Sequence, residues 1–207
     1  MKLIVNIRNM VLVEMLDLKS DKLLDECNTP IKDYTMQVSE EFDQCRKQAF
    51  ALAFRLLNNR DDALEVVQTS LEKGLNHAGA PALDHEEFKP WLFTVVRNKS
   101  IDILRRKKRL PHVEHEEYHT HAPRSSEPDR SLQQMRLKET IESALERLNM
   151  QQKEIVLLRD YHNFSYADIA KILGIAKGSV MSRLHRARMA LREILVAKGI
   201  SLGGNND

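Results

Sequence analysis

The sequence predicts an all-α protein made of two small helical domains joined by a flexible linker. Hydrophobic residues make up 42% of its 207 residues, aromatic residues only 5%, and Gly and Pro are few. This balance favours helices over a strand-rich sandwich. Apolar residues also recur at helical spacing in several consecutive segments. A polar stretch without such periodicity, at residues 110–131, separates these segments into two groups.

The first group of helices is expected between residues 40 and 109. Its first segment carries an apolar stripe at helical spacing, formed by Ala49, Phe50, Ala53, Phe54 and Leu57. The Asn pair at 58–59 ends this helix. Asp61 and Asp62 suit the first turn of the next helix, because acidic side chains favour the positive end of the helix dipole. The inward face of this second helix is expected to be Leu64, Val67 and Leu71.

A loop at residues 76–87 precedes a third helix over residues 88–109. Pro90 fits the first turn of this helix, and the positions expected to point inward are Leu92, Val95, Val96 and Ile103. Its last fourteen residues hold seven Lys and Arg against one acidic residue, Asp102. Such a density of positive charge indicates neutralisation of phosphates, although a solvated helix end has the same composition. Trp91 fits either the core or a platform on which an unpaired base stacks.

The second group of helices is expected from residue 132 to residue 197. It opens with a strong amphipathic stripe at the spacing i, i+4, i+7, i+8, i+11, formed by Leu137, Ile141, Ala144, Leu145 and Leu148. Two shorter helices around residues 155–158 and 166–173 follow. A long helix then contains most of GIAKGSVMSRLHRARMALREIL, residues 174–195.

A helix-turn-helix is indicated by the spacing within SYADIAKILGIAKGSVMSRL. Ser165 with Asp168 three positions later resembles a capping box, in which Asp takes the place of the usual Glu or Gln. Ala170 is small where a second helix would cross closely. Gly174 can adopt the left-handed conformation that ends the first helix, and Val180 anchors the second helix. These residue types at this spacing are what a tight helix-turn-helix needs.

The long helix combines an apolar stripe with basic residues on its other faces. At 100° per residue, Leu184, Ala187 and Leu191 lie within about 40° of Val180. The polar and basic residues on the other faces are Ser182, Arg183, His185, Arg186, Arg188 and Arg192. Arg binds guanine through two hydrogen bonds and Ser reads donors or acceptors, so this surface suits a DNA major groove. A solvated basic helix surface is the alternative interpretation.

Both groups of helices resemble one family, the bacterial sigma factors of the extracytoplasmic-function (ECF) type. The segments AFALAFRLLNNRDDALEVVQTSLEKGL and FKPWLFTVVRNKSIDILRRKKR resemble region 2 of that family. The stretch ALERLNMQQKEIVLLRDYHNFSYADIAKILGIAKGSVMSRLHRARMALREIL resembles its region 4. The resemblance covers residues 42–196, in the order of the family and with a linker between the two blocks.

The resemblance implies a function and its partners. A protein of this family binds core RNA polymerase and directs transcription from specific promoters, by recognising −35 and −10 elements and aiding promoter melting. The implied partners are core RNA polymerase, promoter DNA and, as is common in the family, an anti-sigma factor. No stretch reaches the roughly 18 apolar residues needed to span a bilayer, so a cytoplasmic protein without membrane insertion is expected. No nucleophile–base or phosphate-loop pattern is present, so no enzymatic activity is expected, and neither is a cofactor or a bound metal.

The functional positions of the family fall on four sets of residues in this sequence. Binding of core polymerase is implied for Asp62, Glu65 and Gln68. The loop at residues 76–87 corresponds to the segment that captures a flipped base of the −10 element. Recognition and melting of that element are implied for Trp91, Arg97, Asn98, Asp102, Arg105 and Arg106. Reading of the −35 element is implied for Lys177, Ser179, Ser182, Arg183, His185 and Arg186.

Four positions depart from the family pattern. Thr69 stands where an acidic residue usually follows the clamp-binding glutamine, and Leu64 replaces another commonly acidic residue. Ala176 stands where Pro is common, and Met181 stands where the family usually has Lys or Arg. These departures indicate that polymerase contacts and promoter sequence differ in detail from those of a standard member.

The expected domain organisation has five parts. They are an N-terminal extension without an assigned role (1–39), a region 2-like domain (40–109), a His-rich linker (110–131), a region 4-like helix-turn-helix domain (132–197) and a disordered tail (198–207). Cys27 and Cys45 form no CxxC pair, which suits ordinary reduced thiols in the cytoplasm. The linker histidines suit either Zn²⁺ or Ni²⁺ binding or a merely soluble tether; they are His112, His115, His119 and His121.

Two other classes of protein are compatible with parts of the sequence. An ordinary helix-turn-helix regulator explains residues 165–195 equally well, but it explains neither the Asn- and Arg-rich helix of the other domain nor the segment DALEVVQTSL. Such a regulator binds duplex DNA alone, whereas a sigma factor of this type needs core polymerase to bind its promoter well. An interaction protein with a metal-responsive linker would need the four linker histidines for metal-dependent folding or DNA binding.

Overall fold

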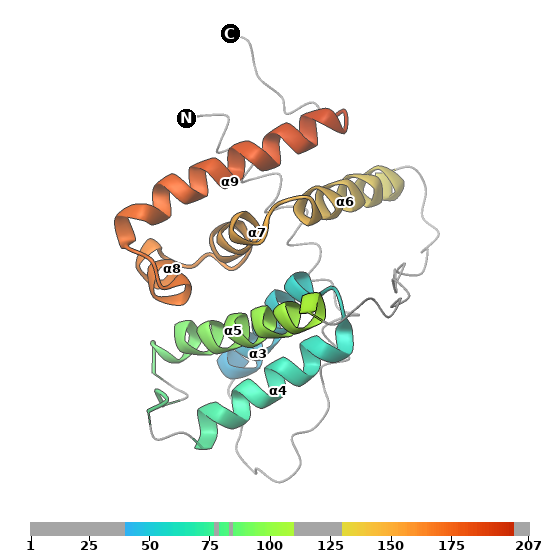
Figure 1. Ribbon diagram of the computed structural model, residues 1–207. Coiled ribbons are helices and arrows are strands. Elements are labelled where there is room, and N and C mark those ends of the chain that lie inside the picture. Colours follow the sequence, from blue (N-terminus) through green and yellow to red (C-terminus); the bar gives the residue numbers. More distant parts are fainter. Residues whose placement is uncertain (1–39, 77–78, 83–84, 110–129, 201–207) are drawn as a thin grey trace. The chain divides into compact units, whose positions relative to one another are not determined.

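The computed structural model describes residues 40–76, 79–82, 85–109 and 130–200, and all regular structure in these ranges is helical (Figure 1). The chain divides into two compact units. The first unit contains the helices α3 (Glu40–Leu57), α4 (Arg60–Asn76) and α5 (Phe88–Arg109). The second is built from α6 (Arg130–Glu146), α7 (Met150–Val156), a π-helical turn η1 (Leu157–Tyr161), α8 (Tyr166–Leu173) and α9 (Lys177–Ala197). The predicted all-α class is confirmed.

In the first unit, each helix packs against the other two around one apolar core (Figure 1). The predicted stripe of α3 is buried apart from Phe54, which is half-buried. The predicted inward face of α4 is displaced, because Leu64 is only half-buried whereas Ala63 and Val66 are buried. Since α4 contacts both neighbours, its buried face is wider than the single stripe that the sequence pattern predicted.

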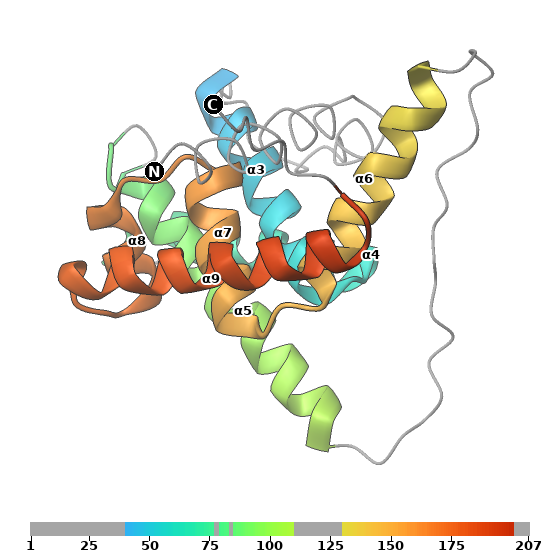
Figure 2. The ribbon, with the colours of Figure 1, turned by 90° about the horizontal axis from the view of Figure 1, so that it is seen from above.

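The buried face of α5 ends at Ser100. Leu92 and Val96 are buried as predicted, but Val95 and Ile103 are half-buried. No residue of 101–109 is buried, since the last turns of α5 project past α3 and α4 (Figure 2). The helix thus extends from the core into solvent, and its basic residues lie on the projecting part.

The turn between α3 and α4 is formed by the two asparagines predicted to end the first helix. Asn58 adopts a left-handed backbone with φ 50°, a conformation that Asn tolerates better than most residues. Asn59 caps α4, because its Oδ1 accepts a hydrogen bond from the backbone N–H of Asp62 at 2.9 Å. One asparagine therefore stops a helix and the other starts the next.

The core of the second unit lies where α9 packs against α6 and α7. Most of the predicted stripe of the first helix in this unit is buried; Leu137 is half-buried. On α9, all four residues predicted to face inward are buried, and Leu195 extends the stripe by one further turn. The long helix is therefore fixed along most of its length by apolar contacts on one side.

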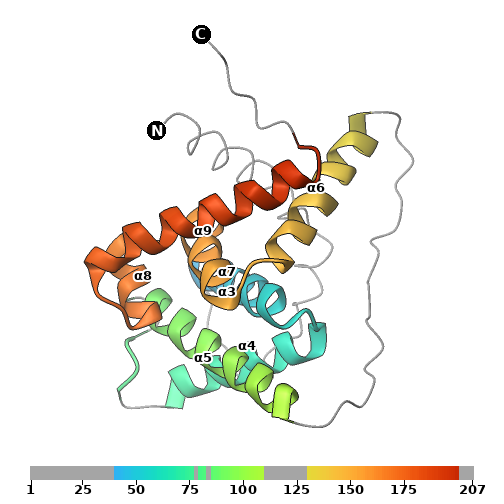
Figure 3. The same cartoon turned by 45° about the horizontal axis from the view of Figure 1, so that its top comes forward.

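The helix-turn-helix consists of α8 and α9 (Figure 3). The backbone N–H of Asp168 donates to Oγ of Ser165 at 3.1 Å, and the Ser165 hydroxyl donates to the Asp168 carboxylate at 2.6 Å. Gly174 has φ 63°, the left-handed conformation predicted to end α8. The next N–H, of Ile175, then donates to the carbonyl of Ala170 at 3.0 Å. The local signals in the sequence thus match the structure of this turn.

A buried ion pair joins the π-helical turn to α9. The N–H of His162 donates to the carbonyl of Leu157 at 2.9 Å, which closes a turn one residue wider than that of an α-helix. Within this turn, both carboxylate oxygens of Asp160 accept hydrogen bonds from Arg188. The two side chains are only 4% and 12% exposed, respectively. Arg188 therefore belongs to the interior, and its predicted place on the basic surface of the helix is wrong.

The ends of the second unit differ from the predicted domain boundaries. Helix α6 begins at Arg130, inside the expected linker. Residues 198–200, which were assigned to the tail, form a cap on α9, because Gly199 has φ 80° and the N–H of Ile200 donates to the carbonyl of Leu195 at 3.1 Å. Lys198 also donates to the hydroxyl of Ser143 at 2.8 Å, which connects the end of α9 to α6.

Removal of Asp160 should destabilise the second unit selectively. We expect Asp160→Ala to lower its free energy of unfolding by about 3–5 kcal/mol, because the variant leaves the Arg188 charge buried and unpaired. Denaturant unfolding followed by circular dichroism measures this loss. The fluorescence of Trp91, the single tryptophan, reports the first unit and should be unchanged.

The double variant Asp160→Leu with Arg188→Met provides the control for that prediction. It removes both charges, so it should regain at least half of the lost stability. A loss below about 1 kcal/mol for Asp160→Ala, the value typical of a surface ion pair, would contradict the structural role of this pair.

Candidate functional site

The exposed side of α9 gathers the residues predicted to contact DNA. The buried stripe of the helix fixes which side chains turn outward. Ser179 is half-buried, and the other five residues of the predicted set are exposed. We call the whole set the recognition face: Lys177, Ser179, Ser182, Arg183, His185 and Arg186.

Two side chains of the recognition face are oriented by the backbone of α9 itself. The Ser182 hydroxyl donates to the carbonyl of Ser179 at 3.1 Å. Nε of Arg186 donates to the carbonyl of Ser182 at 3.3 Å. The Nη groups of Arg186 extend beyond this anchored Nε, so the end of the guanidinium still has donors for a base edge.

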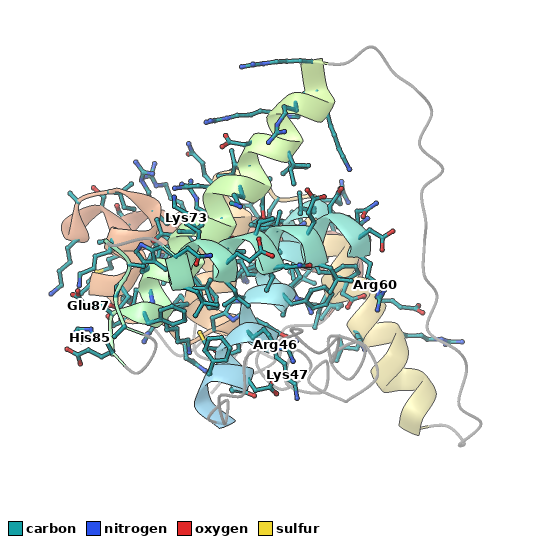
Figure 4. All side chains as sticks on the ribbon, turned by 90° about the horizontal axis from the view of Figure 1, so that it is seen from below. Arg46, Lys47, Arg60, Lys73, His85 and Glu87 are labelled. Carbon is teal, nitrogen blue, oxygen red and sulfur yellow. The ribbon has the colours of Figure 1, made fainter. Side chains whose placement is uncertain are left out.

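The residues predicted to act on the −10 element lie along α5. Trp91 is near its start, and the other five lie on what we call the outer part of α5, residues 97–109, whose last turns project from the first unit (Figures 2 and 4). Asn98 and Arg106 are exposed, and Arg97, which is half-buried, donates from Nη1 to Oδ1 of Asn98 at 3.1 Å. Arg105 lies 3.5 Å from the carboxylate of Asp102, and both are exposed. The basic run that ends this domain is therefore part of a helix.

Asp62 differs from Glu65 and Gln68, the other two residues predicted to bind polymerase, because it forms an ion pair with a residue of α5. Its carboxylate accepts a hydrogen bond from Nζ of Lys107 at 2.5 Å, and its side chain is 25% exposed. This contact links the start of α4 to the end of α5. Lys107 was not indicated as a partner by the sequence pattern, because 45 positions separate the two residues.

An exposed polar stripe runs along α4 and is formed by Glu65, Gln68 and Glu72, which we call the α4 polar stripe. Nε2 of Gln68 donates to Oε1 of Glu72 at 3.1 Å. Thr69 beside it turns its hydroxyl to the helix backbone, where it donates to the carbonyl of Glu65 at 2.8 Å. Glu72 was not predicted as a site residue, although its spacing of four from Gln68 places it on the same face.

Lys99 of α5 lies among charges of α4. Partial burial lowers the pKa of Lys99, and the positive charge of Lys73 lowers it further, whereas the carboxylates of Glu72 and Glu65 oppose this change. Figure 4 shows Lys73 beside α5. The α4 polar stripe and the outer part of α5 are therefore neighbouring surfaces of one unit.

Trp91 packs against the C-terminal part of α4. A Cβ added at Gly74 would lie 3.1 Å from the Trp91 ring and 3.2 Å from that of Phe88. The centroids of these two rings are 6.0 Å apart. Trp91 is half-buried, so the ring fills a place in the packing while part of it is exposed. Gly74 allows this close approach because it has no side chain.

Several expectations fall outside the described residues. These are the four linker histidines, Cys27, and residues 77–78 and 83–84 of the predicted base-capture loop. Burial raises the pKa of the Cys45 thiol to about 11, so this thiol is protonated near neutral pH. In the part of the chain that the structure describes, no three potential metal ligands lie together. None of the helices described there has both the length and the apolar character to cross a membrane.

Comparison with known proteins places both units in one class. Residues 42–110 match the family Sigma-70 region 2, and residues 138–191 match the family Sigma-70, region 4. The first match covers nearly all of α3, α4 and α5, and the second covers the helix-turn-helix with the helices before it. The two family matches and the fold therefore define a sigma factor of the sigma-70 class.

Individual relatives narrow this class. The ECF RNA polymerase sigma factor SigM of Mycobacterium tuberculosis is 33% identical over 144 residues, which are 70% of this chain and 68% of that protein. SigL of the same organism is 32% identical over 163 residues, which are 77% of this chain and 89% of that protein. Among solved structures, this chain resembles the sigma factor RpoE in complex with the anti-sigma factor NepR from Bartonella quintana, with a TM-score of 0.55 and 29% identity. The match covers 75% of this chain and 94% of that chain.

The chain belongs to the ECF family of RNA polymerase sigma factors. It is a sigma factor that acts in promoter-specific transcription initiation.

Crowding at Gly74 should displace the tryptophan. We expect Gly74→Val to shift the fluorescence emission of Trp91 and to cost about 1–3 kcal/mol of stability, because the added side chain overlaps the ring. Gly178→Val is the matched control, since a Cβ at Gly178 meets no atom within 4 Å. An emission spectrum unchanged in Gly74→Val would contradict this packing of Trp91.

Proposed function

We propose that the two units divide promoter recognition between them. Residues 40–109 bind core RNA polymerase and the −10 element, and residues 132–197 bind the −35 element, with the segment between them as the linker. The observation that carries this proposal is the outward orientation of the recognition face, which the packing of α9 enforces.

The second unit binds duplex DNA by placing the start of α9 in the major groove. Arg186 reads a guanine, and Ser182 is oriented for a donor or an acceptor on a neighbouring base. Lys177 lies in the first turn of the helix, and Ala176 before it offers no side-chain acceptor for the first backbone N–H groups. These N–H groups and the helix dipole favour a phosphate at this end, which fixes the register of the helix on the DNA.

The first unit binds the −10 element through the outer part of α5. Arg105, Arg106 and the basic residues after them neutralise phosphates. Asn98 can pair with the edge of an unpaired base, and Arg97 orients its amide through the hydrogen bond between them. Trp91 contributes the exposed part of its ring as a surface for stacking. These groups favour single-stranded DNA, which is what promoter melting requires.

The α4 polar stripe binds core polymerase. Gln68 lies at its centre, and Glu65 and Glu72 flank it. Since the carboxylate of Asp62 is engaged by Lys107, we assign Asp62 to holding α5 against α4, in place of the direct contact with polymerase that the family resemblance implied. The proposed polymerase contact therefore consists of Glu65, Gln68 and Glu72, and it lies closer to the C-terminal end of α4 than the set implied by the family resemblance.

This work needs no covalent chemistry, so the chain is not an enzyme. A sigma factor acts on the chromosome, which places the chain in the cytoplasm. Because the solved relative RpoE is bound to an anti-sigma factor, we also propose a protein partner of that kind for this chain.

Arg186→Ala tests the assignment of the recognition face. We expect the variant to lose about 1–3 kcal/mol of promoter binding and to relax the base preference at one −35 position. Holoenzyme affinities for promoter duplexes with each −35 base replaced in turn measure both effects. Arg147→Ala removes an exposed arginine of the same unit outside the recognition face and should leave selectivity intact. Unchanged selectivity in Arg186→Ala would contradict a groove-facing Arg186.

Gln68→Ala tests the α4 polar stripe. The variant removes the central amide of the stripe, so we expect its affinity for core polymerase to fall at least about fivefold while the fold is kept. Competition with the wild-type chain for limiting core enzyme measures the loss. Gln44→Ala removes an exposed glutamine from α3 of the same unit and should compete normally. If Gln68→Ala also competes normally, the stripe is not the polymerase contact.

A further inference from the structure

Met181 is a large apolar side chain that the fold leaves in solvent. It is 64% exposed, more than Val196 at 50% and Leu75 at 40%, the other exposed large hydrophobic residues among those described. Helical spacing places it in one row with Lys177 and His185, one turn before it and one turn after it. The apolar side chain therefore lies within the surface that carries the recognition face.

The space beside Met181 is open. Gly178 lies three residues earlier on the helix, and a Cβ at this position would meet no atom within 4 Å. Glycine weakens a helix relative to alanine, and no close contact within the second unit requires it here. The bare position leaves room in which the flexible, unbranched side chain of Met181 can extend along the helix surface.

The polar residues in the same row as Met181 indicate what covers it. Lys177 and His185 are exposed on either side of it, and Arg183 and Arg186 are exposed about 160° and 140° around the helix from it. The cationic side chains of this helix end attract the phosphates of DNA. Met181 itself has no charge for a phosphate and no donor for a base edge. The apolar group that distinguishes base pairs in the major groove is the 5-methyl group of thymine.

We propose that Met181 is a specificity-determining residue that contacts the 5-methyl group of a thymine in the −35 element. This thymine belongs to the base pair that lies between those approached by Lys177 and His185. The inference rests on the proposed function of α9 and deepens it. It adds a residue that recognises a base although its side chain has neither charge nor hydrogen-bonding groups.

The test removes the methyl group from the DNA and the side chain from the protein. The probes are promoter duplexes recovered from transcripts that the holoenzyme initiates, with each −35 thymine on either strand replaced singly by deoxyuridine. For the wild-type holoenzyme, one replacement should weaken binding about three- to fivefold, the effect of one buried carbon group. Met181→Ala should bind that duplex and its thymine parent equally well.

Two further variants separate this contact from general effects. Val196→Ala shortens an exposed apolar side chain near the other end of α9 and should keep the discrimination of the wild type. Met181→Lys should lose the discrimination. The slope of the logarithm of its binding constant against the logarithm of the salt concentration should become more negative by about one, because the new lysine neutralises one further phosphate. Because Met181 is exposed, both of its variants should unfold at the urea concentration of the wild type.

The possible failures are distinguishable. If every deoxyuridine replacement affects the wild type and Met181→Ala equally, or if the −35 element has no thymine, Met181 does not read a methyl group and the proposed function of α9 is unaffected. If the wild-type holoenzyme shows no promoter-specific binding, the proposed function fails and this inference fails with it.

Discussion

The ion pair between Asp160 and Arg188 is the constraint on which the arrangement of the second unit depends. A charge pair this deeply buried is tolerated only when both partners are present and hydrogen-bonded. Together with the apolar stripe, it fixes the rotation of α9 about its own axis, because Arg188 must face the π-helical turn. Ser182 and Arg186 are consequently turned outward. One arginine of this helix thus contributes to folding, whereas Arg186 is exposed and is available for the DNA contact proposed above.

Two contacts fix the position of α5 against α4 in the first unit. Trp91 closes over Gly74 at the end of α4, and Asp62 holds Lys107 at its start. Helix α5 is therefore connected to α4 at both ends of their contact, and its basic end projects in a defined direction (Figure 2). The α4 polar stripe lies near Lys99 in the middle of α5, because the charges of Glu72 and Glu65 act on this lysine. If these surfaces have the roles proposed above, one unit holds both polymerase and the opened DNA strand.

Features encoded within a few residues could be predicted from the sequence, and pairings between distant segments could not. Asn59, the pair Ser165–Asp168 and Gly174 act through local backbone geometry, so their residue types indicate their roles directly. The partner of Arg188 could not be predicted, because a basic residue on an amphipathic helix gives the same pattern whether it is solvated or paired. Leu64 departs from the predicted inward face because a periodic stripe assumes one neighbouring helix, whereas α4 packs against two and buries Ala63 and Val66. The expected roles in polymerase and promoter binding depend on the family resemblance, because spacing alone indicates a basic helix and not its partner.

Transcription of genomic DNA fragments by core RNA polymerase, with and without the purified chain, tests the central claim most directly. We expect the chain to bind core polymerase and to produce new transcripts, whose start points share two upstream sequence blocks at a constant separation. Absence of polymerase binding and of new transcripts, with duplex DNA still bound through α9, would contradict the division of promoter recognition between the two units. That result would identify the chain as a helix-turn-helix regulator that acts on duplex DNA alone.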